Sequence, residues 1–188
     1  MSDTLAESTE ETAFLELHKK FNAANKLSSG ILPIQEAALS RFETLGFPHS
    51  KHEMYTFVNT KGLVTTSFAV SNPSASIPEK FISDNIYSGC ETSCMVFVNG
   101  VFNPSLSSLK GIESSVKIST IVENEDTDRI AATLKNENDV FACLANAFCA
   151  EVIVVEIEDN TQVPVPIQAL FVSTGYISAQ SMHSPRLV

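Results

Sequence analysis

The sequence has no tryptophan, few other aromatic residues and few basic residues. Its 12 Lys and Arg residues are outnumbered by 22 Asp and Glu residues, which gives a net charge of -10. Lys and Arg drive binding to a nucleic-acid backbone, so this balance argues against a nucleic-acid partner. No apolar run approaches the about 20 residues that a helix needs to span a bilayer. We therefore expect no membrane partner either.

The sequence also lacks the short motifs of common catalytic sites. None of its seven glycines belongs to a Gly-x-x-x-x-Gly-Lys-Ser/Thr loop, which holds nucleotide phosphates. The Gly-x-Ser-x-Gly turn of serine hydrolases is absent. Glu156 and Glu158 lie two residues apart, on one face of a predicted strand, like the paired carboxylates of a polysaccharide-cleaving enzyme. Without a secretory signal and with few aromatic residues to stack on sugars, we do not favour that enzyme. Because the catalytic motifs are also missing, we predict no enzyme and no catalytic residue.

The first residues, MSDTLAESTEET, are acidic and hydroxylated, unlike a secretory signal or a transit peptide. We expect a cytoplasmic protein whose four cysteines are free thiols. Neither Cys90 and Cys94 nor Cys143 and Cys149 have the two-residue gap of a zinc knuckle. Cys143 and Cys149 are interpreted as small buried hydrophobes. Cys90 and Cys94 are the candidates for a metal or cluster site, on the condition that they share an exposed strand end.

Other residues with ligand chemistry are interpreted as ordinary polar residues. His49 and His52 lie three apart beside Glu53, but the run is not His-Glu-x-x-His. His183 is the other histidine with a candidate role. The acidic turn 123–128 lacks the spaced ligands and the glycine of an EF-hand. We predict no cofactor and no metal bound by this chain alone.

Two amphipathic helices are predicted at the start of the chain. In the first, Ser8 and Glu11 have the spacing of a capping box, and the helix is expected to end near residues 28–30. Its apolar face contains Phe14, Leu17, Phe21 and Ala24. The second starts near Pro33 and ends at Gly46. Its apolar face contains Ile34, Ala38, Phe42 and Leu45.

Strands dominate the rest of the predicted structure. Asn99 and Gly100 predict a type I′ hairpin over 94–103, and Val116, Ile118 and Ile121 mark another short strand. Asp139 is expected to cap a short apolar helix. Later strands are predicted from Val152, Val154 and Ile157, and then from Val163, Val165, Ile167, Leu170 and Val172.

Two further segments complete the coarse prediction. Tyr55 and Phe57 are expected on one face of an extended segment under the helices, and residues 61–91 are expected to be mostly loop. The fold class is α+β, in three regions. They are an N-terminal helical hairpin and linker motif (1–60), a small mixed region that contains the hairpin (61–137) and a strand-rich core (138–188).

Four segments carry a family resemblance. Gly46, Pro48, Lys51 and Glu53 fit Gly-hydrophobic-Pro-Thr-x-Lys-x-Glu-x-Trp-x-Tyr, with His49, Tyr55 and Phe57 at the Thr, Trp and Tyr positions. Residues 97–109 resemble Phe-Val-Asp-Gly-x-Phe-x-Pro-x-Leu-Ser-Ser-Leu. Residues 141–148 resemble Phe-Ala-x-Leu-Asn-x-Ala-Phe, with Ala145 in place of Asn, and residues 166–174 resemble Pro-Ile-x-Leu-x-Phe-Val-Ser-Thr. These are motifs of the SufB/SufD family of iron–sulfur cluster assembly proteins, and the chain is most similar to SufD.

The resemblance implies a fold and a function. Residues 138–188 would contain the first coils of a right-handed parallel β-helix, truncated after Val188. Val152, Glu158 and Asn160 occupy positions where the family has turn-forming Gly or Pro. The protein would be a non-catalytic scaffold, pairing with a SufB-like paralogue and a SufC-like ABC ATPase, and the iron–sulfur cluster would form at the level of the complex.

Two consequences and two alternatives accompany that interpretation. In the family the ATPase docks on a C-terminal helical region, so we expect it to bind these 188 residues weakly or not at all. An open β-helix edge would favour self-association. The alternatives are an independent protein-interaction module and a thiol-based carrier of iron or clusters.

Overall fold

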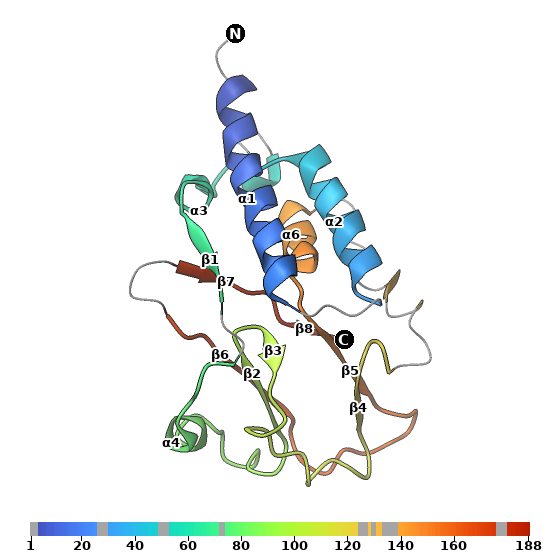
Figure 1. Ribbon diagram of the computed structural model, residues 1–188. Helices are drawn as coiled ribbons and strands as arrows, with labels where there is room; N and C mark the ends of the chain where they lie inside the picture. Colours follow the sequence, from blue (N-terminus) through green and yellow to red (C-terminus); the bar gives the residue numbers. More distant parts are fainter. Residues whose placement is uncertain are drawn as a thin grey trace.

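The computed structural model describes residues 4–25, 30–48, 53–71, 74–123, 128, 131–132, 139–175 and 180–188, with only the backbone described for 4–11 and 54. The longer helices are α1 (Thr4–Ala24), α2 (Leu32–Leu45) and α6 (Val140–Ala147). Shorter helical turns are η1 (Glu53–Tyr55), α3 (Lys61–Val64) and α4 (Glu79–Ser83). The longer helices gather at one end of the molecule and most strands at the other (Figure 1). This mixture confirms the predicted α+β class.

Helix α1 begins earlier than predicted. It starts at Thr4, so Ser8 and Glu11 lie inside the helix and the predicted capping box is wrong. The central part of the apolar face is confirmed, because Phe14, Leu17 and Phe21 are buried. The predicted face does not extend to the end of the helix, where Ala24 is exposed.

Helix α2 follows its sequence signals closely. Pro33 lies in the first turn, and Gly46 ends the helix with a φ of 62° while its N–H donates to the carbonyl of Phe42. The buried residues are Gln35, Ala38 and Phe42. Leu45 lies at the end of the helix and is exposed, so its predicted place on the buried face is wrong.

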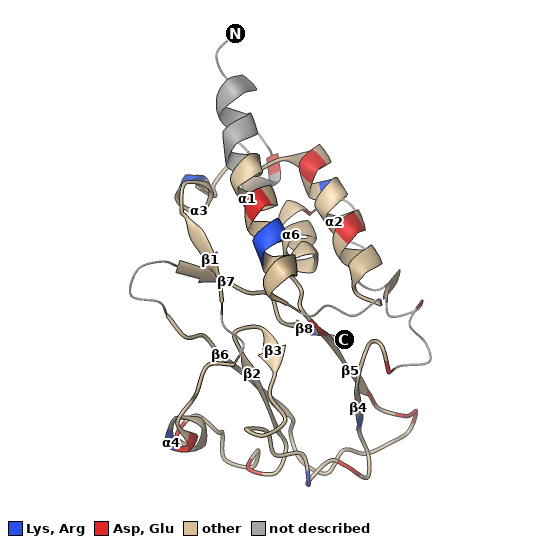
Figure 2. Ribbon diagram, viewed as in Figure 1, with Lys and Arg blue, Asp and Glu red and all other residues tan. Residues whose placement is uncertain are grey.

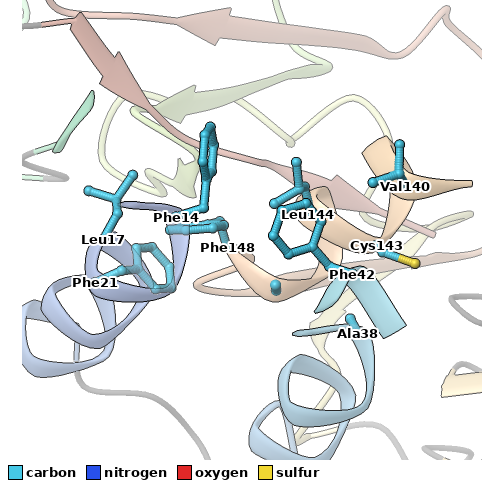
Figure 3. Packing of buried hydrophobic residues seen from close by; sticks show 10 residues of the cluster. Phe14, Leu17, Phe21, Ala38, Phe42, Val140, Cys143, Leu144 and Phe148 are labelled. Carbon is cyan, nitrogen blue, oxygen red and sulfur yellow. The ribbon is translucent and has the colours of Figure 1, made fainter. Parts of the chain in front are cut away.

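Helix α6 packs against both other helices of the helical layer. Its predicted cap is confirmed: Asp139 Oδ1 accepts hydrogen bonds from the N–H groups of Phe141 at 2.9 Å and Ala142 at 3.2 Å. Its segment, VFACLANA, carries no charge and packs between α1 and α2 (Figure 3). The charged residues of the helical layer lie instead on α1 and α2 (Figure 2). The cluster contains Phe14, Leu17, Phe21, Ala38, Phe42, Val140, Cys143, Leu144, Ala147 and Phe148.

Three small sheets are formed by the described strands. The first pairs β1 (Phe68–Val70) with β7 (Gln180–Met182). The second has the order β3 (Val101–Phe102), β2 (Cys94–Val98) and β6 (Gln168–Val172). The third has the order β4 (Lys117–Thr120), β5 (Val152–Glu156) and β8 (Arg186–Leu187).

The two central strands are covered on both faces. In β5, Val152 and Val154 face a cluster with Ile31 of the helical layer, whereas Ile153 packs with Phe97 of β2. Strand β2 is buried along its whole length, although hairpin strands commonly have one solvated face. The predicted hairpin is confirmed, with positive φ angles at both turn residues.

The last part of the chain wraps across all three sheets. Strand β6 pairs in parallel with β2, β7 in parallel with β1, and β8 in parallel with β5. We call its described residues, 168–175 and 180–188, the C-terminal coil. Each of its strands is an edge strand of its sheet. The coil therefore joins segments that are distant in the sequence, and this is the feature that positions the site described below.

Several predictions are corrected. Tyr55 lies in the turn η1, not in an extended segment, and Phe57 is fully exposed rather than packed under the helices. Strand β5 ends at Glu156, so Glu158 does not share a strand face with it. Residues 163–167 form no strand. Segment 61–91, by contrast, is mostly loop as predicted, with the short elements α3, β1 and α4 in it.

The remaining predicted features are assigned as follows. Strand β4 confirms the predicted strand around Ile118. Within the acidic turn, residues 124–127 lie outside the described residues. Within the described ranges, no helix is long and apolar enough to cross a membrane.

Candidate functional site

One group of polar contacts between the coil and the rest of the chain surrounds the hairpin turn between β2 and β3. Asn99 is buried, and its side chain forms two hydrogen bonds with Thr174 of the coil. The amide Nδ2 donates to the Thr174 hydroxyl at 2.6 Å, and Oδ1 accepts from the Thr174 backbone N–H at 2.8 Å. The backbone N–H of Asn99 also donates to Val172. One side chain thus fixes the position of the strand end of β6 against the turn.

Gly100 allows the coil to approach the other side of this turn. It has a φ of 90°, which a side chain would disfavour. A Cβ atom there would lie 3.1 Å from the Cβ of His183 and 3.3 Å from the backbone N of Ser184. We call Asn99, Gly100, Ser173, Thr174 and His183 together the turn junction. Two segments of the family resemblance, 97–109 and 166–174, meet here.

A serine and a histidine are hydrogen-bonded in the turn junction. Ser173 Oγ lies 2.7 Å from His183 Nε2. Burial lowers the pKa of His183, which favours the neutral ring. The other ring nitrogen, Nδ1, is buried without a hydrogen-bond partner among the described residues. A serine nucleophile needs a base that a third group orients. Among the described residues no such group contacts Nδ1, so the pair has two members of a catalytic triad and no described third.

A small cavity lies beside the junction. It is lined by the aromatic residues Phe21 and Phe148 and by polar residues that include Asn25, Asn99 and His183. Its volume of about 10 Å³ is close to what one water molecule requires. A substrate of metabolite size does not fit in this space.

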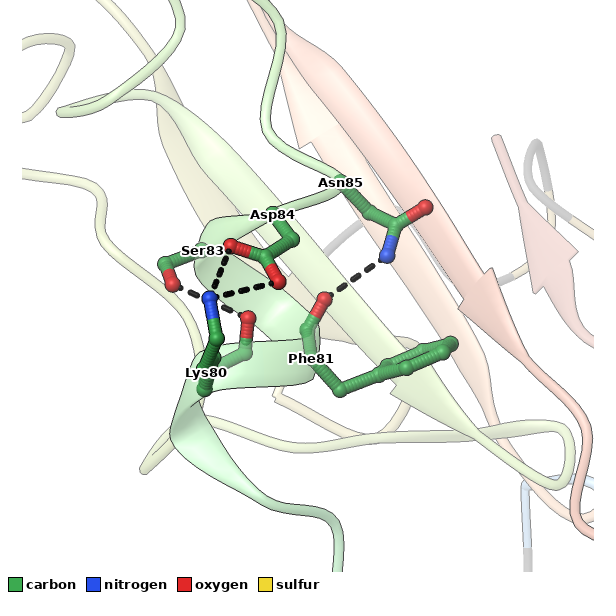
Figure 4. Close-up of polar contacts among 5 residues, drawn as sticks. All are labelled: Lys80, Phe81, Ser83, Asp84 and Asn85. Carbon is green, nitrogen blue, oxygen red and sulfur yellow. Dashed lines mark hydrogen bonds and ion pairs between the residues drawn. The ribbon is translucent and has the colours of Figure 1, made fainter.

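Gln168 forms a second attachment of the coil. Its side-chain Oε1 accepts from the N–H of Tyr87 at 2.8 Å, and Nε2 donates to the carbonyl of Asn85 at 2.8 Å. The short helix α4 precedes this loop; Lys80 pairs with Asp84 there at 3.0 Å (Figure 4). Gln168 therefore fixes the start of β6, as Asn99 fixes the backbone just after its end.

Ser93 makes a third polar attachment at the start of β6. Ser93 donates from its hydroxyl to the carbonyl of Pro166 at 2.5 Å, and its own carbonyl accepts from the N–H of Gln168. Pro166 and Gln168 belong to the family-like segment 166–174. These family-like residues act by joining chain segments.

The structure places the candidate thiols away from solvent. Cys90 and Cys94 are both buried, so the exposed strand end on which their metal role depended is not found. Burial, together with the neighbouring Cys90 thiol, raises the pKa of Cys94. Within the described residues, no group of three His, Cys, Asp or Glu side chains is placed to hold a metal ion. His49 and His52 lie outside the described residues.

The other two cysteines are confirmed as buried. Cys143 lies in the α6 core, and burial raises its pKa. Burial raises the pKa of Cys149 to about 12, and its Sγ donates to the carbonyl of Glu151 at 3.0 Å. A thiol attacks or binds metal as its thiolate. Both groups are therefore held in the unreactive form.

The buried polar side chains that the sequence patterns missed include His18 and Gln35 of the two N-terminal helices. His18 stacks near Phe21 and contacts the edge of Phe148, and burial lowers its pKa. Gln35 donates to the carbonyl of Cys149 at 2.7 Å. Their positions carried the signal: His18 is four residues after Phe14, and Gln35 is three before Ala38. Both lie on faces that the apolar spacing already marked as buried.

The family model described as the SufBD protein N-terminal region matches residues 8–169 of this sequence. No curated protein matches this sequence. The match begins in α1 and ends in β6, so it includes the helical layer, the hairpin turn and the start of the C-terminal coil.

Proposed function

This chain belongs to the SufB/SufD family, and on that premise we propose that it is a scaffold subunit for iron–sulfur cluster assembly. In this proposal it is similar to SufD, works in the cytoplasm and is itself non-catalytic. It pairs with a SufB-like paralogue in a complex that also contains a SufC-like ABC ATPase. The cluster forms at the level of this complex, so the chain needs no metal or cofactor of its own.

One observation supports a scaffold role above the others. The C-terminal coil presents β6 and β8 as edge strands, and each carries an apolar side chain that solvent reaches. Phe171 of β6 is 51% exposed although its ring stacks on buried Phe97, and Leu187 of β8 is 42% exposed. An edge strand offers backbone donors and acceptors that a partner can extend. These two edge strands, which belong to separate sheets, are the surface that we propose for the paralogue.

The chemistry of the thiols supports the same choice. A thiol-based carrier requires thiolates that iron can reach. The four cysteines are buried, and burial raises the pKa of Cys94, Cys143 and Cys149. We therefore do not favour the carrier alternative.

A binding experiment tests the proposal directly. The full chain is mixed with the purified SufB-like paralogue, and complex formation is followed by analytical ultracentrifugation. Phe171→Glu is expected to weaken binding at least tenfold, because it adds a charge to the edge. Phe57→Glu is the matched control, since Phe57 is fully exposed and lies on no strand. Equal losses in both variants, or no complex with the wild-type chain, would contradict the proposal.

A reconstitution experiment separates the scaffold from the carrier alternative. Iron and sulfide are added anaerobically to the complex and to the chain alone, and visible absorbance is recorded. We expect a cluster spectrum from the complex only. A spectrum from the chain alone that disappears in a Cys90→Ala, Cys94→Ala variant would favour the carrier.

A further inference from the structure

The described strands of the C-terminal coil pair with strands from earlier in the chain and not with one another. Its three strands pair with β2, β1 and β5, which all belong to the body of the protein before residue 157. Between described strands of the coil there is no pairing. The body therefore presents a complete acceptor for an extended segment, formed by strands in three separate sheets.

Specific polar groups of the body, one side chain and several backbone groups, bind the coil in addition to the strand pairing. Asn99 forms hydrogen bonds with Thr174. The backbone groups of Asn85 and Tyr87 form hydrogen bonds with the side chain of Gln168. The carbonyl of Ala142 accepts from Arg186 at 3.3 Å. These contacts fix one register along each acceptor strand. A segment with the same sequence, in the same register, is the occupant that satisfies them.

The seam between coil and body also has unfavourable features. The cavity of about 10 Å³ lies along it, beside His183 and Ser184. His183 Nδ1 and Arg186 Nε are buried without hydrogen-bond partners among the described residues. A buried polar atom without a partner is unfavourable, and water satisfies it when the interface opens. Undocking of the coil thus exposes these two atoms to water. It also removes Met182 from the edge of the helical core and breaks the bond from Arg186 to Ala142 of α6.

The connection to the coil has little structure of its own. Residues 157–167 contain no helix or strand, and Pro164 and Pro166 in this connection are exposed. A proline lacks the N–H that a strand ladder requires, so this connection resists joining a neighbouring sheet. It is long enough to redirect the coil without disturbing β5.

We propose that the C-terminal coil is exchangeable between two copies of this chain. The coil undocks as a unit, and the acceptor strands of each molecule take the coil of the other. The reciprocal dimer keeps every contact of the closed monomer, so exchange costs little beyond association. The proposal is independent of the scaffold function, because it needs no paralogue, ATPase or cluster.

A cysteine pair across β1 and β7 tests exchange in the full chain. Ala69 and Ser181 are register partners, and neighbouring strands lie about 4.8 Å apart, which a disulfide can bridge. The Ala69→Cys variant, carrying a mass tag, is mixed at high concentration with an untagged Ser181→Cys variant. After incubation the mixture is oxidised with diamide and run on a non-reducing gel. We expect a covalent heterodimer that joins the two variants.

Three controls decide the result. The Ala69→Cys, Ser181→Cys double variant oxidised when dilute should give a cross-linked monomer, which shows that the site forms a disulfide and that the chain is folded. A mixture of Ala69→Cys with Gln162→Cys should give little heterodimer, because exposed Gln162 is outside the register. Adding Asn99→Gly to both partners should accelerate exchange several-fold by releasing Thr174. Heterodimer no greater than with Gln162→Cys, while the double variant cross-links, would overturn the proposal.

Discussion

The hydrogen bonds between Asn99 and Thr174 give a sharp test of how the coil is attached. Asn99 has a φ of 49°, in the left-handed region, and is 3% exposed. Asn99→Ala removes both side-chain bonds and keeps a Cβ in this unfavourable conformation. Asn99→Gly removes the same bonds but relieves the backbone. Asn99→Asp keeps an acceptor for the Thr174 N–H, and the Thr174 hydroxyl can turn to donate to the other carboxylate oxygen.

The expected magnitudes follow from these contacts. Leaving a buried N–H without its acceptor costs about 1–3 kcal/mol, and a non-glycine residue in the left-handed region costs about 1–2 kcal/mol. We therefore expect Asn99→Ala to lower the free energy of unfolding by about 2–5 kcal/mol and Asn99→Gly by about 1–3 kcal/mol. Asn99→Asp should stay within about 1 kcal/mol of wild type at neutral pH.

Urea unfolding at neutral pH measures these differences as shifts of the midpoint at constant slope. Thr174→Val supplies the matched control, because it removes the hydroxyl but keeps the backbone N–H. In a Thr174→Val background Asn99→Asp should become destabilising, since the carboxylate then loses its hydroxyl donor. If Asn99→Asp destabilises the wild-type background as much as Asn99→Ala does, the Thr174 contact does not hold the turn and the reasoning fails.

Three further predictions concern single positions. Gly100→Ala should destabilise by about 1–2 kcal/mol more than Gly89→Ala in thermal unfolding, because both glycines have a φ of 90° but only a Cβ at Gly100 meets His183. Asp139→Ala should cost about 1 kcal/mol of stability through loss of the α6 cap, whereas Asp139→Asn should cost little. Burial lowers the pKa of His18 from 6.5 in the folded state. The contribution of the neutral His18 ring to the free energy of unfolding should therefore be fully present above pH 6.5 and be lost as the pH falls through the lowered pKa. His18→Gln should flatten the stability profile in that window, and an unchanged slope would assign the titration elsewhere.

Local signals predicted local structure well. The turn at Asn99 and Gly100, the cap at Asp139 and the stop at Gly46 each depend on a few neighbouring residues, and all three are found where predicted. Residues 163–167 show the limit of this approach. Their alternating apolar residues predicted a strand, but Pro164 and Pro166 lack N–H donors and the segment forms no strand.

Burial in the strands depended on contacts that no local window contains. Val152 and Val154 predicted a strand, but not which segments would cover it. The strand lies between β4 and β8, and its two faces meet the helical layer and β2. In the same way, His18 and Gln35 are polar by type and were not assigned to the core. Their burial follows from the helix faces on which they lie, and each finds a backbone carbonyl as its partner.

The candidate site also depends on a contact between segments that are distant in the sequence. The sequence identified segments 97–109 and 166–174 by resemblance, but it gave no reason why two distant segments should share a role. The structure supplies it, since Asn99 and Thr174 are 75 residues apart and bonded to each other. Asn99 stands where the motif that this segment resembles has Asp, and both side chains carry an oxygen that can accept from the Thr174 N–H. In this chain the two segments therefore make a contact between the hairpin and the coil, and coil attachment is the property that substitutions at Asn99 and Thr174 are expected to change.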